Sequence, residues 1–142
     1  RLGKFRRLQI CLIGRDCNMK DRITHKHVQA ACDDYNKARK LSSGDCGFLQ
    51  WADIRGDGTS RARLYAFTGR GGVCNSDIQR HTMRQTIAAI RLAIAMYRLP
   101  SYCVIIRATH ERGESQRAAL SELNARGLWL SAEQRAQAGL LP

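Results

Sequence analysis

The segment from Tyr102 to Gly127 constrains the fold most, because two different periodicities meet in it. Residues 102–107 contain three consecutive β-branched side chains, which favour a strand. A polar turn follows, and apolar residues then recur at helical spacing over 115–126. Gly127 is the residue type preferred just past the end of a helix. The segment therefore predicts a strand, a turn and an amphipathic helix in direct succession.

Three further apolar runs predict strands, over 8–13, 48–54 and 61–67. The dipeptide Asp57-Gly58 is typical of the tight connection in a β-hairpin. We therefore expect the second and third of these strands to pair.

Helical spacing of apolar residues predicts three more helices. The first covers 24–38 and has Thr24 as its N-cap. The second is long: Ser76 and Gln79 have the spacing of a capping box at its start, and Pro100 ends it. The last is short and lies near the C-terminus.

The predicted order is β-α-β-β-α-β-α, followed by the short helix. Helices that alternate with strands predict an α/β fold, in which a mixed β-sheet carries helices packed on it. A full helix separates the strand at 102–107 from the hairpin, so this strand should lie parallel to one neighbour. The length of 142 residues suits a single domain, 1–142, with one core.

The chain is strongly basic. It has 24 Lys and Arg against 12 Asp and Glu, which gives a formal net charge of +12. Such a charge favours a nucleic acid or an anionic membrane as the partner. We see no long apolar span and no signal peptide, so we expect no membrane partner.

Six cysteines are spread over the chain without a Cys-x-x-Cys pair: Cys11, Cys17, Cys32, Cys46, Cys74 and Cys103. Several fall at apolar positions of predicted elements, which favours free thiols in a reducing compartment. A metal site could be assembled from His25 and His27 together with Cys11, Cys17, Cys32 and Cys46, but these residues lack the spacing of zinc ligands. We therefore expect neither a bound metal nor a cofactor.

Two loops have the composition of phosphate-binding sites. Residues 68–72 read TGRGG, so that backbone N–H groups could approach a phosphate while Arg70 adds charge. No Gly-Lys-Ser/Thr follows, so this is not a Walker loop, and an ordinary strand-to-helix turn is the alternative. The second loop follows the strand of the opening segment and carries Arg107, His110 and Arg112. Unpaired N–H groups at the start of the next helix attract anions there.

Arg84, Arg91 and Arg98 repeat every seven residues along the long helix, and no Glu four residues away balances them. A row of this kind is often only a solvated face, but in so basic a chain we expect phosphates opposite it. Charge and spacing add four more candidates for RNA contact: Arg61, Arg63, Arg80 and Arg117.

An enzyme is the competing interpretation. Asp53 and Asp57 lie in or beside the hairpin, but two-metal nucleases need several converging carboxylates, and the strand at 102–107 offers none. Both aspartates are explained more simply as turn residues. A general base for RNA cleavage could come from one of the four histidines, although no spacing in the sequence marks two of them as a catalytic pair: His25, His27, His81 and His110. We expect no enzymatic activity and keep a small basic ribonuclease or toxin domain as the alternative.

From Gly47 onward the chain resembles small-subunit ribosomal protein S-eleven, a universal ribosomal family. The matching segments are WADIRGDG at 51–58, LYAFTGRGG at 64–72, MRQTIAAIRLAI at 83–94, VIIRATHERGES at 104–115 and ALSELNARGLWL at 119–130. The last segment is the most specific. The chain departs from the family where ATHERGES replaces a proline-glycine turn before Arg-Glu-Ser, and the family's basic, proline-rich tail is missing.

The resemblance implies a ribonuclease-H-like core at 47–130, with a probable insertion at 14–46 that contains an extra helix, and a short C-terminal helix in 131–142. It implies a structural constituent of the ribosome that binds small-subunit ribosomal RNA on the platform, beside neighbouring small-subunit proteins, and supports assembly and translation. The departures are typical of an organellar version, which would place the chain on the ribosome of the mitochondrial matrix; a cytoplasmic or plastid ribosome is the alternative.

Carried over by matching position, the residues that the resemblance places on RNA lie in the two loops: Thr68, Gly69, Arg70, Gly71, Gly72, His110, Arg112, Gly113, Glu114 and Ser115. Arg107 joins them by charge. Ser115 either donates to phosphate or caps its helix, and Glu114 caps the helix or pairs with an arginine. Both loops should meet the same RNA. Large-subunit protein L-eighteen, whose core has a similar order of elements, is the alternative within the ribosome.

Overall fold

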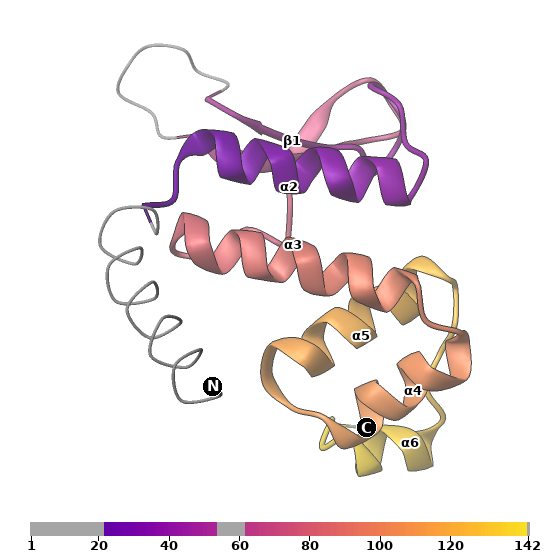
Figure 1. Ribbon diagram of the computed structural model, residues 1–142. Coiled ribbons are helices and arrows are strands. Elements are labelled where there is room, and N and C mark those ends of the chain that lie inside the picture. Colours follow the sequence, from indigo (N-terminus) through magenta and orange to yellow (C-terminus); the bar gives the residue numbers. More distant parts are fainter. Residues whose placement is uncertain (1–21, 54–61, 142) are drawn as a thin grey trace, which may run out of the picture.

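The computed structural model describes residues 22–53 and 62–141. These residues form five helices and a three-stranded antiparallel sheet, in the order α2-β1-β2-β3-α3-α4-α5-α6. Helix α2 packs against β1 and α3, and α3 in turn packs against α5 (Figure 1). The predicted mixture of helices and strands is confirmed.

Helix α2 covers His25–Ala38, as the sequence predicts. Its N-cap is Thr24, whose backbone N–H donates to Nδ1 of His27 at 3.0 Å. Five apolar residues recur at helical spacing in this part of the sequence; four of them, Val28, Ala31, Cys32 and Tyr35, are buried, and Ala38 is partly buried.

Strands β1 (Leu49–Ala52) and β2 (Arg63–Phe67) pair antiparallel, with Trp51 opposite Leu64. This confirms the predicted pairing, although the Asp57-Gly58 connection lies outside the described residues.

The side-chain amide of Asn36 joins α2 to the edge of this sheet. It donates to the Leu49 carbonyl at 2.9 Å and accepts from the Leu49 N–H at 2.8 Å. Asn36 thus satisfies backbone groups that a neighbouring strand would otherwise satisfy.

The glycine-rich segment 68–72 is a hairpin turn, and the strand-to-helix alternative is wrong. It leads into a third strand, β3 (Val73–Asn75), in which Cys74 faces Ala66 of β2. The sequence did not predict β3 because all three of its residues are exposed, so no alternation of apolar and polar side chains marks it.

Helix α3 covers Met83–Tyr97 and begins later than predicted. Its N-cap is Thr82, whose Oγ1 accepts the N–H of Gln85 at 3.0 Å. Ser76, which we expected in this role, instead accepts the N–H of Ile78 at 3.2 Å. Both positions have the Ser/Thr-x-x-Gln spacing, so the sequence does not distinguish them.

The strand predicted at 102–107 is instead helix α4, Ser101–His110. Val104 and Ala108, four residues apart, are buried against α5, while Ile106 between them is 52% exposed. This spacing is that of a helix with one packed face. The order β-α-β-β-α-β-α and the parallel strand pairing are therefore wrong over the described residues, where the sheet is wholly antiparallel.

The remaining helices agree with the sequence. Helix α5 covers Gly113–Ala125, and Gly127 follows it with a φ of +71°. Helix α6 covers Ala132–Gln137 and is capped by Ser131 as predicted.

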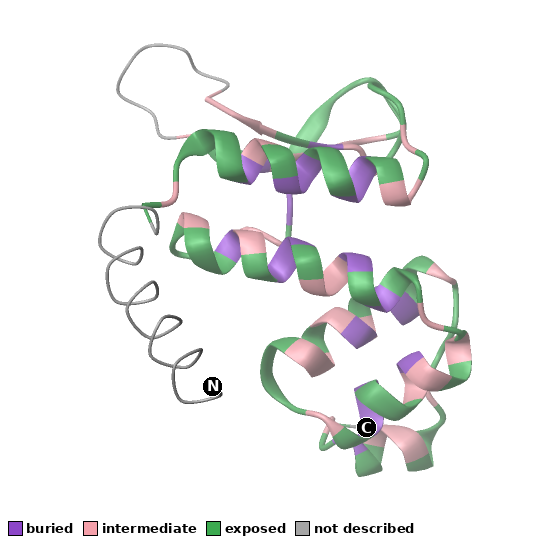
Figure 2. Ribbon diagram, viewed as in Figure 1, coloured by how far each residue is buried: buried purple, intermediate pink, exposed green. Residues whose placement is uncertain are grey.

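The buried residues form two clusters, one among α2, β1, β2 and α3 and the other among the end of α3, α4 and α5 (Figure 2). Helix α3 contributes to both and so connects the two halves of the described fold. The predicted strand at 8–13 lies outside the described residues, and the division into 14–46, 47–130 and 131–142 stays a prediction.

Candidate nucleic-acid interface

The glycine-rich turn at 68–72 is closed on its own threonine. The Thr68 hydroxyl accepts the N–H of Gly72 at 3.2 Å and that of Arg70 at 3.4 Å. Gly71 has a φ of +81°, which favours glycine. Two of the N–H groups that we expected to hold a phosphate are thus directed at the hydroxyl. The exposed side chain of Arg70 is the cation that this turn presents to solvent.

Arg112, in the turn between α4 and α5, is engaged with the backbone. Its Nη1 donates to the carbonyls of Thr109 at 3.0 Å and Glu111 at 2.9 Å, and its Nη2 donates to Gln137 at 3.0 Å. Carbonyls near helix ends lack helical partners, so Arg112 satisfies groups of both α4 and α6. The structure gives this guanidinium a role in joining helices.

The start of α5 already holds carboxylates of this chain. Glu111 accepts from the Ser115 hydroxyl and lies 3.3 Å from Nε of Arg107. Glu114 follows in the first turn of α5, after Gly113 at a φ of +70°. Negative side chains are the favoured partners of a helix N-terminus, so the anion site predicted here is filled from within the fold.

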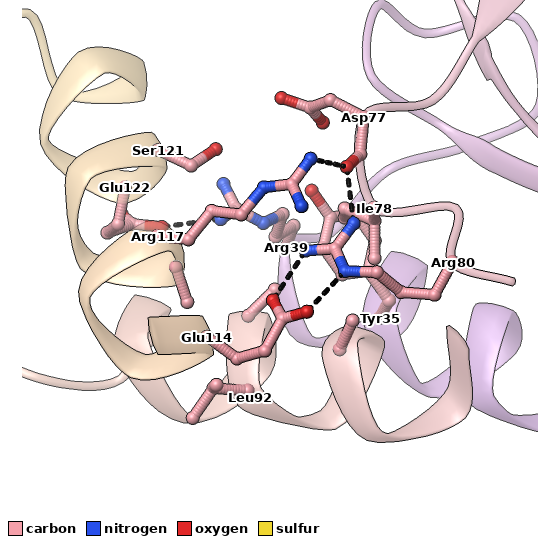
Figure 3. Close-up of a pocket in the computed structure, with 13 residues that line it drawn as sticks. Tyr35, Arg39, Asp77, Ile78, Arg80, Leu92, Glu114, Arg117, Ser121 and Glu122 are labelled. Atoms are coloured by element: carbon pink, nitrogen blue, oxygen red, sulfur yellow. Dashed lines mark hydrogen bonds and ion pairs between the residues drawn. The ribbon is translucent and has the colours of Figure 1, made fainter. Parts of the chain in front are cut away.

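Arg80 lies in the segment that connects β3 to α3, and its side chain lies between this segment and α5 (Figure 3). Its Nε and Nη2 each donate to a carboxylate oxygen of Glu114 at 2.7 Å, and its Nη1 donates to the Asp77 carbonyl at 2.7 Å. Hydrogen bonds from Arg80 hold the pKa of Glu114 below its usual value. Arg117 reaches the same Asp77 carbonyl at 3.3 Å. Arg80 is only 13% exposed, so its main contacts are internal.

A second arginine network, which the sequence did not reveal, joins α2 to α5. Glu122 is 3% exposed; its Oε1 lies 2.5 Å from Nη2 of Arg39 and its Oε2 lies 2.7 Å from Nε of Arg126. The Arg39 guanidinium also lies over the rings of Tyr35 and Tyr97, at 4.9 and 4.5 Å from their centroids. No local pattern marks this network, because Arg39 and Glu122 are 83 residues apart in the chain.

Three arginines of α3 remain at the surface. Arg84, Arg91 and Arg98, the arginine stripe, are all exposed, and the exposed positions of α3 can be followed in Figure 2. A rise of 1.5 Å per residue separates successive members by about 10.5 Å along the helix. Arg91 lies 3.9 Å from Asp34, but both side chains are about 60% exposed, so water weakens this pair. Arg63 on β2 is exposed as well.

The structure does not bring the two predicted loops together. The 68–72 turn belongs to the sheet, whereas the turn after His110 lies among α4, α5 and α6; in Figure 1, α2 and α3 lie between them. His110 is exposed. Arg61 lies outside the described residues.

A trough beside the start of α3 was not predicted either. It has a volume of about 690 Å³. Side chains from α2, from the sheet and from the segment between β3 and α3 line it, among them His25, Trp51, Asp53, Arg63, Gln79 and His81. A second hollow shares Arg63 and His81 with it and extends to Arg117. Because three separate segments build the trough, no local sequence pattern could reveal it.

Within residues 22–53 and 62–141, no group of three His, Cys, Asp or Glu side chains is arranged to hold a metal ion. Cys32, Cys46, Cys74 and Cys103 are free thiols. Burial raises the pKa of the Cys32 thiol to about 12.

None of the described helices combines the length and the apolar character needed to cross a bilayer. Comparison with known protein families, with curated proteins and with solved structures found no match to this chain.

Proposed function

We propose that this chain binds RNA through the phosphate backbone, with the arginine stripe of α3 as the central contact. The observation that carries the proposal is the exposure of all three arginines along one helix of a chain with a net charge of +12. This exposure and the net charge support the proposal, and the solvent-exposed Asp34 beside Arg91 is compatible with it.

A row of cations on a rigid helix suits a polyanion. Contacts to phosphate set the position of a protein on a nucleic acid and carry little sequence information. Folded RNA is recognised largely by shape, through phosphates and 2′-hydroxyls. Further exposed arginines lie on β2, in the 68–72 turn and on α5, namely Arg63, Arg70 and Arg117, and Arg107 on α4 is half-exposed.

The setting that we propose is the small ribosomal subunit, most simply that of a mitochondrion, with the chain as a structural component and not an enzyme. The sequence resemblance to protein S-eleven supports this setting, above all ALSELNARGLWL at 119–130 and the glycine-rich segment at 68–72. The strand expected between them is helix α4, so the support comes from these motifs and not from a shared sheet.

RNA binding is tested by measuring the affinity for a fluorescently labelled structured RNA as a function of salt. Each neutralised phosphate contributes roughly 0.7–0.9 to the slope of log affinity against log salt. Replacing Arg91 and Arg98 by glutamine should lower that slope by roughly 1.4–1.8. The matched control, Arg91→Lys with Arg98→Lys, keeps both charges and should keep the slope. A slope that the glutamine variant leaves unchanged would refute the stripe as the contact.

The setting is tested by sedimentation of the native protein. The chain should travel with the small subunit and be released at high salt; recovery in large-subunit fractions alone would favour the L-eighteen alternative.

Incubation of the purified chain with RNA and a divalent metal addresses the ribonuclease alternative. RNA cleavage that disappears on His110→Ala or Asp53→Asn would overturn a purely structural role.

A further inference from the structure

One wall of the trough beside α3 is built from Trp51 and His25. The indole Nε1 of Trp51 donates to Nδ1 of His25 at 2.8 Å, and the two ring centroids are 5.8 Å apart with a 34° angle between the planes. An indole N–H can only donate, so Nδ1 of His25 is the acceptor and the ring proton lies on Nε2. The bond fixes both rings and leaves an N–H of His25 for another partner.

This aromatic wall is anchored to the core through Trp51. Trp51 is half-buried and packs against the core cluster that contains Leu49 and Leu64. Exposed Arg63 and His81 line the same trough. An aromatic face that is fixed before binding loses little conformational entropy when a flat ligand stacks on it.

The other polar side chains of the trough serve mainly to shape it. Gln79 accepts the N–H of Leu64 at 2.6 Å and donates to the Arg80 carbonyl at 2.7 Å, so both ends of its amide are used. Arg80 is paired with Glu114. Among the described residues that line the trough, Asp53 is the only acidic one. Its carboxylate would repel a phosphate, whereas it can accept a hydrogen bond from the amino group of a base.

We propose that the trough receives an unpaired base of the RNA, stacked on Trp51, while the neighbouring phosphates lie against Arg63 and His81. This inference rests on the proposed function and adds that the bound RNA contains a single-stranded segment. A volume of about 690 Å³ lies within the usual range for small-molecule sites and accommodates a nucleotide. Aromatic side chains stack on bases that are splayed out of a strand, and bases inside a duplex are not accessible in this way.

The chain contains two tryptophans, which makes the inference testable by fluorescence. Trp129 is 85% exposed, so Trp129→Phe leaves Trp51 as the single reporter with little effect on packing. This variant is titrated with a single-stranded oligonucleotide and with a duplex of equal phosphate number, and the anisotropy of the labelled RNA is followed in parallel. The single strand should quench Trp51 with the same midpoint as the anisotropy, and the duplex should leave the emission unchanged.

The possible failures are distinguishable. RNA that binds by anisotropy without changing the Trp51 emission overturns the base site and leaves the proposed function in place, whereas the absence of any RNA binding overturns both.

A substitution gives a second test. His25→Ala removes the ring partner but not the core contact, and Trp51→Leu removes the stacking surface. Each should weaken single-strand binding, roughly tenfold for the latter, and leave duplex binding unchanged. Equal losses on both RNAs, or no loss on either, would contradict the proposal. Circular dichroism verifies that the Trp51 variant remains folded.

Discussion

The arginines of this chain differ in what their guanidinium groups face. Arginine carries five N–H donors and no acceptor, so one whose guanidinium lies against the fold is satisfied by several oxygens. Arg112 finds three backbone carbonyls, and Arg126 reaches the carbonyls of Met96 and Leu99 in addition to Glu122. The sequence shows these side chains only as positive charges. Their oxygen partners come from other elements, so the sequence predicts how many cations there are better than it predicts which ones are held inside the fold.

Arg112→Gln tests the division between structural and surface arginines. The variant loses hydrogen bonds from a charged donor to three carbonyls, and because Arg112 is itself exposed to water the free energy of unfolding should fall by roughly 1 kcal/mol. Arg107, 44% exposed and paired with the 38% exposed Glu111, is the matched control and should change by under about 0.5 kcal/mol as Arg107→Gln. Urea unfolding measures both. Similar values for the two variants would show that the carbonyl contacts of Arg112 contribute little.

The thiols provide a second prediction at this scale. The thiolate is the reactive form, and burial raises the pKa of Cys32 to about 12. In the native protein at pH 8, iodoacetamide should therefore modify the exposed Cys46 and Cys74 and leave Cys32 unmodified. Mass spectrometry of proteolytic peptides assigns each site. In urea, Cys32 should react as fast as the other two, and rapid native labelling of Cys32 would contradict its burial.

Among the secondary-structure elements, those that carry their own terminal signals were predicted best. Thr24 and Ser131 cap α2 and α6, and Gly127 follows α5, so these helices were found from the sequence. Helix α4 was not found, because the preference of β-branched residues for strands depends on packing and is easily overridden. In α4 the packing against α5 prevails, since residues four apart reach one buried face.

Paired alanine substitutions in α4 distinguish the helix from the predicted strand. In a strand, residues 104 and 106 would share a face and respond alike. In the helix, Val104 is fully buried and Ile106 is 52% exposed. Val104→Ala should therefore cost roughly 2 kcal/mol of unfolding free energy, and Ile106→Ala should stay within about 0.5 kcal/mol of the wild type. Thermal and urea unfolding measure both, and losses of equal size would restore the strand.

For the molecule as a whole, the composition predicts a polyanionic partner, which stays a prediction, and the fold determines which cations are exposed to meet one. The two loops that looked like one RNA site are separated by α2 and α3 (Figure 1). The arginine stripe lies on α3, the helix that both core clusters share. An RNA bound there would lie over the junction between the half made of α2 and the sheet and the half made of α4, α5 and α6. The contact between the two halves should therefore determine the shape of the protein surface that such an RNA meets.

That contact includes Glu122 of α5, which is paired with Arg39 at the end of α2 and with Arg126 at the end of α5. Glu122 is 3% exposed and the two arginine side chains are 18% and 20% exposed, so none of the three charges is well solvated by water. Removing the carboxylate leaves two poorly solvated cations unpaired, which costs roughly 3 kcal/mol in comparable buried pairs. Glu122→Gln should therefore lower the free energy of unfolding by about that amount, while Glu133→Gln on the exposed face of α6 should change it by under about 0.5 kcal/mol.

Hydrogen exchange shows whether the Glu122 bridge couples the two halves. If it does, Glu122→Gln should lower amide protection in α2 as well as in α5, because each helix loses its partner across the junction. Replacing two of its three members by apolar residues, Arg39→Met with Glu122→Leu, should recover part of the lost stability, because only one cation then lacks its carboxylate and this cation, Arg126, still donates to the carbonyls of Met96 and Leu99. A loss of protection confined to α5 would mean that the halves are held together by the apolar packing of α3 alone, and the double variant would then be no more stable than Glu122→Gln.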